Sequence, residues 1–158
     1  MTAAFTPPAE PARTPVLLPD CPLCTEDGGT LIWRDERLRV IRANEPGFPA
    51  FYRVVWNSHL PEFSDLSGFE RMHCMEAVTV VEHALLQHLA PTKINIAALG
   101  NKVPHLHWHI VARFDWDSHF PEPPWAAAQR ERNLAQEAVV CERLPALEAV
   151  LRLQLPRC

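Results

Sequence analysis

Three histidines alternate along one short segment, because His105, His107 and His109 are separated only by Leu106 and Trp108. In an extended strand, alternate side chains lie on the same face about 6.6 Å apart. The three imidazoles are therefore expected to line one surface. A neutral imidazole can attack phosphorus, and a neighbouring one can donate a proton, since histidine titrates near neutral pH. The spacing indicates a site for nucleophilic and acid–base chemistry.

Two other interpretations of these histidines stay open. Three histidines form the ligand set of hydrolytic zinc enzymes, although consecutive strand positions usually bring only two imidazoles to one ion. A solvent-facing strand that carries histidines by chance is the other interpretation. We favour a functional site because clustered titratable groups mark such sites.

A second group with metal-binding chemistry lies earlier in the chain, where Cys21 and Cys24 have the spacing of a metal knuckle. The alternatives are two unconnected thiols or a redox pair, but no helical pattern directly follows the second cysteine. The chain has 5 cysteines, an odd number, and its N-terminal residues do not resemble a secretory signal. We therefore expect thiols or metal ligands in the cytoplasm rather than a disulfide framework.

The histidines must be positioned by the segment 103–112, in which apolar residues alternate with the histidines. This period of two predicts a strand with one buried face. Arg113 falls on the histidine face, where it either reaches a ligand or pairs with a carboxylate, and we favour the carboxylate.

The remaining elements follow from apolar periodicity and from breaker residues. Apolar runs at 31–33 and 38–41 predict a hairpin, and 51–56 and 94–99 predict further strands, the last closed by Gly100. Ser67 and Glu70 form a capping box that predicts a helix to about Leu89. Helix-forming composition from residue 125 predicts a C-terminal helix, and Pro145 is expected to start a second, short one.

The run 105–111 resembles the histidine-triad (HIT) motif, in which three histidines alternate with apolar residues and two apolar residues follow, and all seven positions match. Asn95, Gly100 and the segment 53–59 also resemble their counterparts in the family, and the likeness covers about Cys21 to Arg113. The resemblance implies an α+β fold with an antiparallel sheet of about five strands, one long helix and C-terminal helices. Members of the family usually form homodimers.

The resemblance also implies an activity and assigns residues to it. HIT proteins cleave or transfer a nucleoside monophosphate at the α-phosphorus, and by the motif His107 is the nucleophile and His109 a donor beside the phosphate. Four further residues are expected to hold phosphate oxygens: Asn95, Gly100, Asn101 and Lys102. Lys102 serves equally well as a solvated turn residue. A non-catalytic nucleotide- or partner-binding protein on the same scaffold is the alternative function.

Some HIT proteins carry a structural zinc, and the matching ligands here are Cys21, Cys24, His59 and His105. No organic cofactor is expected.

The sequence differs from the usual family pattern at two places that concern substrate recognition. Where many members carry an acidic residue for the ribose hydroxyls, only Asn44 or Glu45 is nearby, and the residues before the triad differ from the usual glutamine and hydroxyl pair. The physiological substrate and the base are therefore not indicated.

The bulk properties limit the partners. The chain has 158 residues and a formal net charge of −4, which argues against broad electrostatic binding to nucleic acid. It has no apolar run long enough to cross a membrane. We expect residues 1–19 to form a mobile, proline-rich tail and residues 20–158 to form one domain.

Overall fold

Five short strands form one antiparallel sheet in the computed structural model, which describes residues 14–156. The strands lie in the order β1-β2-β3-β5-β4. Their bounds are Thr30–Arg34 (β1), Leu38–Arg42 (β2), Phe51–Trp56 (β3), Lys93–Ala97 (β4) and His107–Arg113 (β5). The helices are α1 (Pro22–Thr25), α2 (Gly68–Leu89) and α3 (Leu134–Gln154), and a 3₁₀ turn spans Phe63–Asp65. The family-derived expectation of an α+β fold is confirmed, as are the predicted hairpin and strands.

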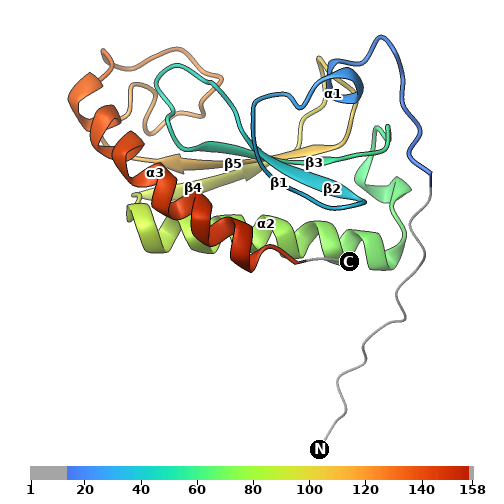
Figure 1. Ribbon diagram of the computed structural model, residues 1–158. Helices are drawn as coiled ribbons and strands as arrows, with labels where there is room; N and C mark the ends of the chain where they lie inside the picture. Colours follow the sequence, from blue (N-terminus) through green and yellow to red (C-terminus); the bar gives the residue numbers. More distant parts are fainter. Residues whose placement is uncertain (1–13, 157–158) are drawn as a thin grey trace, which may run out of the picture.

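The two faces of the sheet have different roles, and Figure 1 shows α2 and α3 together on one of them. On that side Ile110 and Ala112 of β5 belong to the main apolar core. The opposite face carries His107 and His109, which alternate with these apolar residues. The strand period therefore separates the core from the histidines.

The long helix α2 begins where the capping box predicts. The Ser67 side chain accepts a hydrogen bond from the Glu70 amide, and the Glu70 carboxylate accepts one from the Ser67 amide. The helix ends at Leu89, and Ala90 follows with φ of 48°, in the left-handed conformation that often closes helices. The predicted bounds of this helix are confirmed.

The C-terminal prediction is wrong in two respects. Residues 125–133 are irregular rather than helical, and α3 is one helix with Pro145 inside it rather than at its start. A proline interior to a helix removes one backbone hydrogen bond. The apolar face nevertheless continues on both sides of Pro145, since Leu144, Leu147 and Leu151 are all buried. Packing on the rest of the core therefore outweighs the local cost of the proline.

The predicted histidine strand and the predicted N-terminal tail are the two other segments to compare with the structure. The predicted histidine strand starts only at His107, because His105 and Leu106 lie in the preceding coil. Of the predicted tail, residues 1–13 lie outside the described part, while Val16 donates to Ser58 Oγ (2.9 Å) and accepts from the His59 amide (2.7 Å). The division into tail and domain stays a prediction. Across residues 14–156, the helices are too short or too polar to span a bilayer.

Candidate functional site

Strand β5 holds His107 and His109 side by side on the face opposite the helices. Their ring centroids lie 4.7 Å apart with planes at 79°, and both side chains are buried. His105 is buried as well, but its ring lies against that of His59, with centroids 5.1 Å apart. The alternating motif therefore divides into a pair of histidines on the strand and one histidine that belongs to a separate cluster.

The hydrogen bonds of His107 determine which of its nitrogens is free. Its Nδ1 lies 2.6 Å from the His105 carbonyl oxygen, and a carbonyl only accepts, so Nδ1 carries the proton. The other nitrogen, Nε2, then keeps its lone pair. Burial lowers the pKa of His107 despite the bond to the His105 carbonyl, and the charge of Arg53 lowers it further. The ring is therefore neutral at neutral pH and has the form of a nucleophile.

His109 has the opposite arrangement, because its partner is a donor. Arg53 on β3 is paired in register with His109, and its Nε lies 3.4 Å from His109 Nδ1. Burial, the neighbouring His107 and the charge of Arg53 lower the pKa of His109 to about 3. Arg53 was not singled out as a site residue from sequence, because a strand pairing between distant segments leaves no local pattern.

Aromatic rings surround His109 from two distant segments. Phe51 of β3 and Trp125 of the 114–133 connection lie with centroids 5.4 Å and 5.2 Å from the imidazole, both edge to face. Trp125 is half-exposed, so its indole forms part of the rim of the site. Residue 125 lies far beyond the motif, and no role could be assigned to it from sequence.

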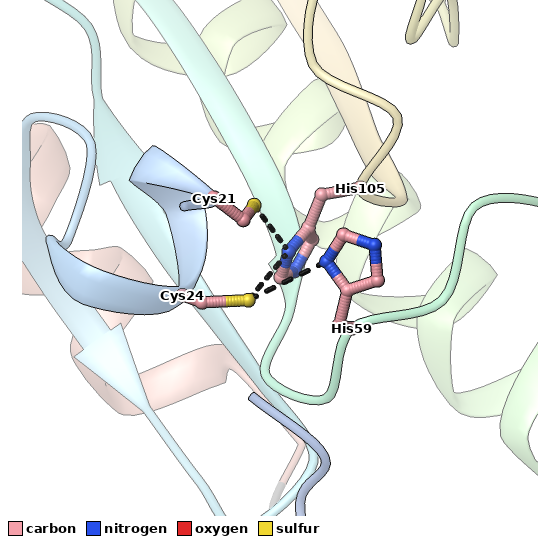
Figure 2. Close-up of side chains that lie close together, drawn as sticks. All are labelled: Cys21, Cys24, His59 and His105. Carbon is pink, nitrogen blue, oxygen red and sulfur yellow. Dashed lines mark hydrogen bonds between the residues drawn. The ribbon is translucent and has the colours of Figure 1, made fainter. Parts of the chain in front are cut away.

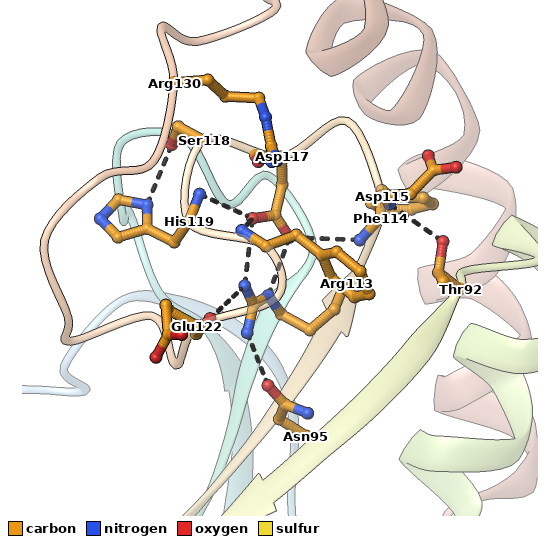
Figure 3. Close-up of polar contacts among 11 residues, drawn as sticks. Thr92, Asn95, Arg113, Phe114, Asp115, Asp117, Ser118, His119, Glu122 and Arg130 are labelled. Atoms are coloured by element: carbon orange, nitrogen blue, oxygen red, sulfur yellow. Dashed lines mark hydrogen bonds and ion pairs between the residues drawn. The ribbon is translucent and has the colours of Figure 1, made fainter.

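Asn95 reaches the histidine face from β4, where it pairs in register with Val111. Its side-chain oxygen accepts from Arg113 at 2.6 Å, as Figure 3 shows. An arginine has no acceptor, so this bond fixes the orientation of the amide and leaves its NH₂ hydrogens to donate elsewhere. Among residues 14–156 no partner accepts them. Asn95 is thus oriented as a donor.

Arg113 is held by a buried carboxylate rather than by solvent. Its guanidinium bonds both oxygens of Asp117, at 2.8 and 3.1 Å, and both side chains are about 2% exposed (Figure 3). Burial alone would raise the pKa of Asp117, but hydrogen bonds from Arg113 and from the backbone amides of His119 and Phe114 outweigh it and hold this pKa below its usual range. The predicted carboxylate partner for Arg113 is confirmed.

In the turn that follows β4, one residue lines the site and the next two are exposed to solvent. Gly100 has φ of 73°, a conformation that favours glycine, and lines a pocket of about 140 Å³ together with His105 and His107. Asn101 and Lys102 are exposed beyond it. Gly100 is therefore the member of this turn that lies next to His107.

A cluster of two cysteines and two histidines lies at the other end of the histidine face (Figure 2). Cys21 caps the start of α1 and Cys24 lies within it, while His59 follows β3 and His105 precedes β5. The four ligand atoms all lie within 4.8 Å of one another. Sγ of Cys24 is 3.4 Å from Nδ1 of both histidines, and Sγ of Cys21 is 3.4 Å from Nδ1 of His105.

This donor set fits a tetrahedral zinc ion. Standard Zn–S and Zn–N bond lengths put sulfur and nitrogen about 3.5 Å apart in such a site, close to the 3.4 Å seen here. The Trp56 carbonyl oxygen lies 2.6 Å from Nε2 of His105, which places the proton there and leaves Nδ1 free to bind a metal. Burial raises the pKa of the Cys24 thiol, so a bound cation is needed to hold its thiolate.

The arrangement does not support a metal centre made of the three motif histidines. In the described part of the chain, the one group of ligand atoms close enough for a shared ion includes His105 but neither His107 nor His109. The third interpretation, a chance row of exposed histidines, also fails because all three are buried.

Comparison with known proteins gives one family. The model of the HIT domain family matches residues 25–116, more than half of the chain. No curated protein matches. Among solved structures, a histidine triad protein from Bradyrhizobium japonicum is 27% identical with a TM-score of 0.65, over 82% of this chain and 92% of that one.

Two further solved structures have the same fold. A histidine triad protein from Sinorhizobium meliloti is 25% identical, with a TM-score of 0.58 over 76% of this chain and 90% of that one. One from Marinobacter aquaeolei is 24% identical, with a TM-score of 0.63 over 79% of this chain and 92% of that one. The matched family region contains His59, Asn95 and the three motif histidines, while both cysteines of the cluster precede it.

Proposed function

The chain belongs to the HIT family, and on that premise we propose that it binds a nucleoside phosphate derivative and cleaves it at the α-phosphorus. Dinucleoside polyphosphates and nucleoside phosphoramidates are the substrate classes proposed. The reaction is a hydrolysis or a nucleotidyl transfer through a nucleotidyl-histidine on His107.

The observation that carries this proposal is the hydrogen bond from His107 Nδ1 to the His105 carbonyl. It supports a neutral ring with its lone pair on Nε2. When Nε2 bonds to phosphorus, the ring becomes positively charged, and the carbonyl at Nδ1 stabilises that charge and keeps the ring oriented.

In the proposed first step, the Nε2 lone pair of His107 forms a bond to the α-phosphorus. The bond from phosphorus to the leaving oxygen or nitrogen breaks, and the leaving group departs with that electron pair and takes a proton from water. In the second step, water or another acceptor attacks phosphorus and loses a proton. The P–N bond then breaks, and its electron pair returns to Nε2, which restores neutral His107.

Donors around His107 are proposed to bind the phosphate oxygens, on which negative charge develops in the transition state. The oriented NH₂ of Asn95 supports this role, and so does the position of Gly100 beside His107. His109 is proposed as a further donor. Asn101 and Lys102 lie farther out on the turn, where they suit contacts with a more distant part of the substrate.

We further propose that Cys21, Cys24, His59 and His105 bind a structural zinc ion. The ion would be closed to substrate because all four of its positions are taken by the protein. The role of the zinc ion would therefore be structural: it would hold the segment that carries Cys21 and Cys24 against the start of β5.

A homodimer in the cytoplasm completes the proposal. Strand β4 is an outer strand of the sheet, and both Ile96 within it and Leu99 just after it are exposed. An unpaired strand edge with exposed apolar side chains favours pairing with a second copy. Neither nucleic acid nor membrane is proposed as a partner.

Turnover of a small substrate panel tests the function. Adenosine phosphoramidate, diadenosine polyphosphates and a nucleotide sugar are incubated with wild type and with His107→Ala, each checked for folding. We expect turnover by wild type and its loss in the variant, with a mass increase of one nucleotidyl group on wild type after rapid quenching. Binding of nucleotide without any turnover by wild type would instead favour the non-catalytic alternative.

A further inference from the structure

Arg53 lies on the catalytic face of the sheet without a role in the proposed reaction. Strand β3 is paired with β5, and the register sets Arg53 directly opposite His109. Residues opposite each other in an antiparallel pair project from the same face. The guanidinium therefore lies beside the histidine pair, and its Nε is 3.4 Å from His109 Nδ1.

This contact has only one chemical form. Arginine keeps its charge at any accessible pH and has donors only, so His109 Nδ1 must be the acceptor. Because the pKa of His109 is lowered to about 3, its ring is neutral near pH 7 and carries a single proton. With Nδ1 as acceptor, that proton is on Nε2.

We propose that Arg53 is a positioning residue that holds His109 in the tautomer with its proton on Nε2, so that His109 donates a hydrogen bond to the substrate phosphate. This inference rests on the proposed function. It adds a residue outside the histidine motif, and it makes the two neighbouring rings complementary. His107 presents a lone pair at Nε2, and His109 presents an N–H at the same ring position.

Two further contacts of the guanidinium hold Arg53 in position. Its NH2 nitrogen bonds the Glu45 carboxylate at 2.8 Å, and its charge lies 5.5 Å from the centre of the Phe51 ring. The Glu45 side chain is 42% exposed, and ion pairs with such exposure add little stability. The pair therefore serves to orient Arg53 toward His109 more than to stabilise the fold.

The tautomer is measured directly by long-range ¹H–¹⁵N spectra of the imidazole rings in the full chain loaded with zinc, with His109→Gln used to assign the signals. Wild type is expected to show His109 protonated on Nε2. Arg53→Met removes the donor, and Arg53→Lys keeps the charge but has no Nε–H at this position. Both variants are expected to shift His109 toward the form protonated on Nδ1.

Arg42→Met is the matched control, because Arg42 also lies on a strand and pairs with a carboxylate, that of Glu148, but contacts no histidine. It is expected to leave the His109 tautomer unchanged. A wild-type His109 protonated on Nδ1, or the same tautomer in wild type and both Arg53 variants, would overturn the proposal.

Kinetics test the consequence. We expect Arg53→Met to lower kcat by roughly tenfold to a hundredfold with little change in KM, since a donor to developing charge acts in the transition state. Arg42→Met should stay within about twofold of wild type. An unchanged kcat in Arg53→Met would overturn the positioning role. Absence of turnover in wild type would refute the proposed function instead, while the spectra would still decide the tautomer.

Discussion

The polar side chains on the histidine face are oriented by partners that can act in only one way. A carbonyl oxygen accepts from His107, whereas guanidinium groups donate to His109 and to Asn95. Each bond removes an ambiguity, either of an imidazole tautomer or of an amide orientation. The result is one lone pair and several N–H donors around a single small region, an arrangement suited to a phosphate group.

Asp117 is the residue on which the orientation of Asn95 depends, through Arg113. Asp117→Asn removes the buried countercharge of Arg113, and breaking such a pair costs about 3–5 kcal/mol. We expect the free energy of unfolding in urea at pH 7 to fall by roughly that amount. Glu142→Gln, at an exposed position of α3, is the control and should change little. A loss under about 1 kcal/mol in Asp117→Asn would contradict the role assigned to this pair.

The same residue gives a pH dependence with a definite sign. The pKa of Asp117 lies below its usual value in the folded protein, so its ionised form adds stability above the unfolded pKa of about 3.8. That contribution is lost as the pH falls through the lower, folded-state pKa. We therefore expect the difference in unfolding free energy between wild type and Asp117→Asn to be largest above pH 5 and to shrink below about pH 4. A difference that is constant from pH 3 to pH 7 would refute this assignment.

Helix α3 shows how packing overrides a local signal. Leu151 lies beyond Pro145 and is fully buried, whereas Leu153, two residues later, is 86% exposed. Leu151→Ala is expected to lower the free energy of unfolding by about 2–5 kcal/mol, and Leu153→Ala by less than about 0.5 kcal/mol. Chemical denaturation of both variants measures this. Equal effects would mean that the helix after Pro145 does not pack on the core.

The elements that could be predicted from sequence are those with a local signal. Short apolar runs predicted the first four strands, alternation predicted β5, and Ser67 with Glu70 predicted the start of α2. The predicted bounds of the C-terminal helix were wrong. The alanines at 126–128 locally favour a helix and Pro145 locally favours a helix start, but packing contacts with distant residues override both preferences. The register that sets Arg53 against His109, and the path that brings Trp125 to the same ring, are long-range and have no local pattern.

The proposed assembly of two copies depends on the free edge of β4. The other outer strand, β1, is covered only in part: α3 packs against it and Arg152 donates to the Ile32 carbonyl. Ile96→Glu places a charge on the exposed edge of β4, where it opposes pairing with a second copy. We expect light scattering after gel filtration to change from a dimer to a monomer. His83→Glu, on the exposed face of α2, should leave the mass unchanged, and a dimeric Ile96→Glu would exclude this edge as the interface.

The cysteine–histidine cluster joins three parts of the chain that are distant in sequence, so its metal should stabilise the whole domain. A ligand that binds only the folded state adds roughly 4 kcal/mol when it is present at a thousand times its Kd. Cys24→Ser removes one ligand, and we expect it to lose bound zinc by elemental analysis and to melt at a lower temperature than wild type. Cys141→Ser, at an exposed thiol, should keep both properties.

A chelator gives the decisive comparison, because it acts on the metal without changing the sequence. It should lower the Tm of wild type and of Cys141→Ser, and leave that of Cys24→Ser unchanged. Since the ion is fully coordinated by protein and His107 lies outside the cluster, the turnover per folded molecule should survive chelation at a temperature where the metal-free chain stays folded. Full metal retention in Cys24→Ser would remove this site. Turnover that stops at once on chelation, with the fold intact, would instead make the metal catalytic.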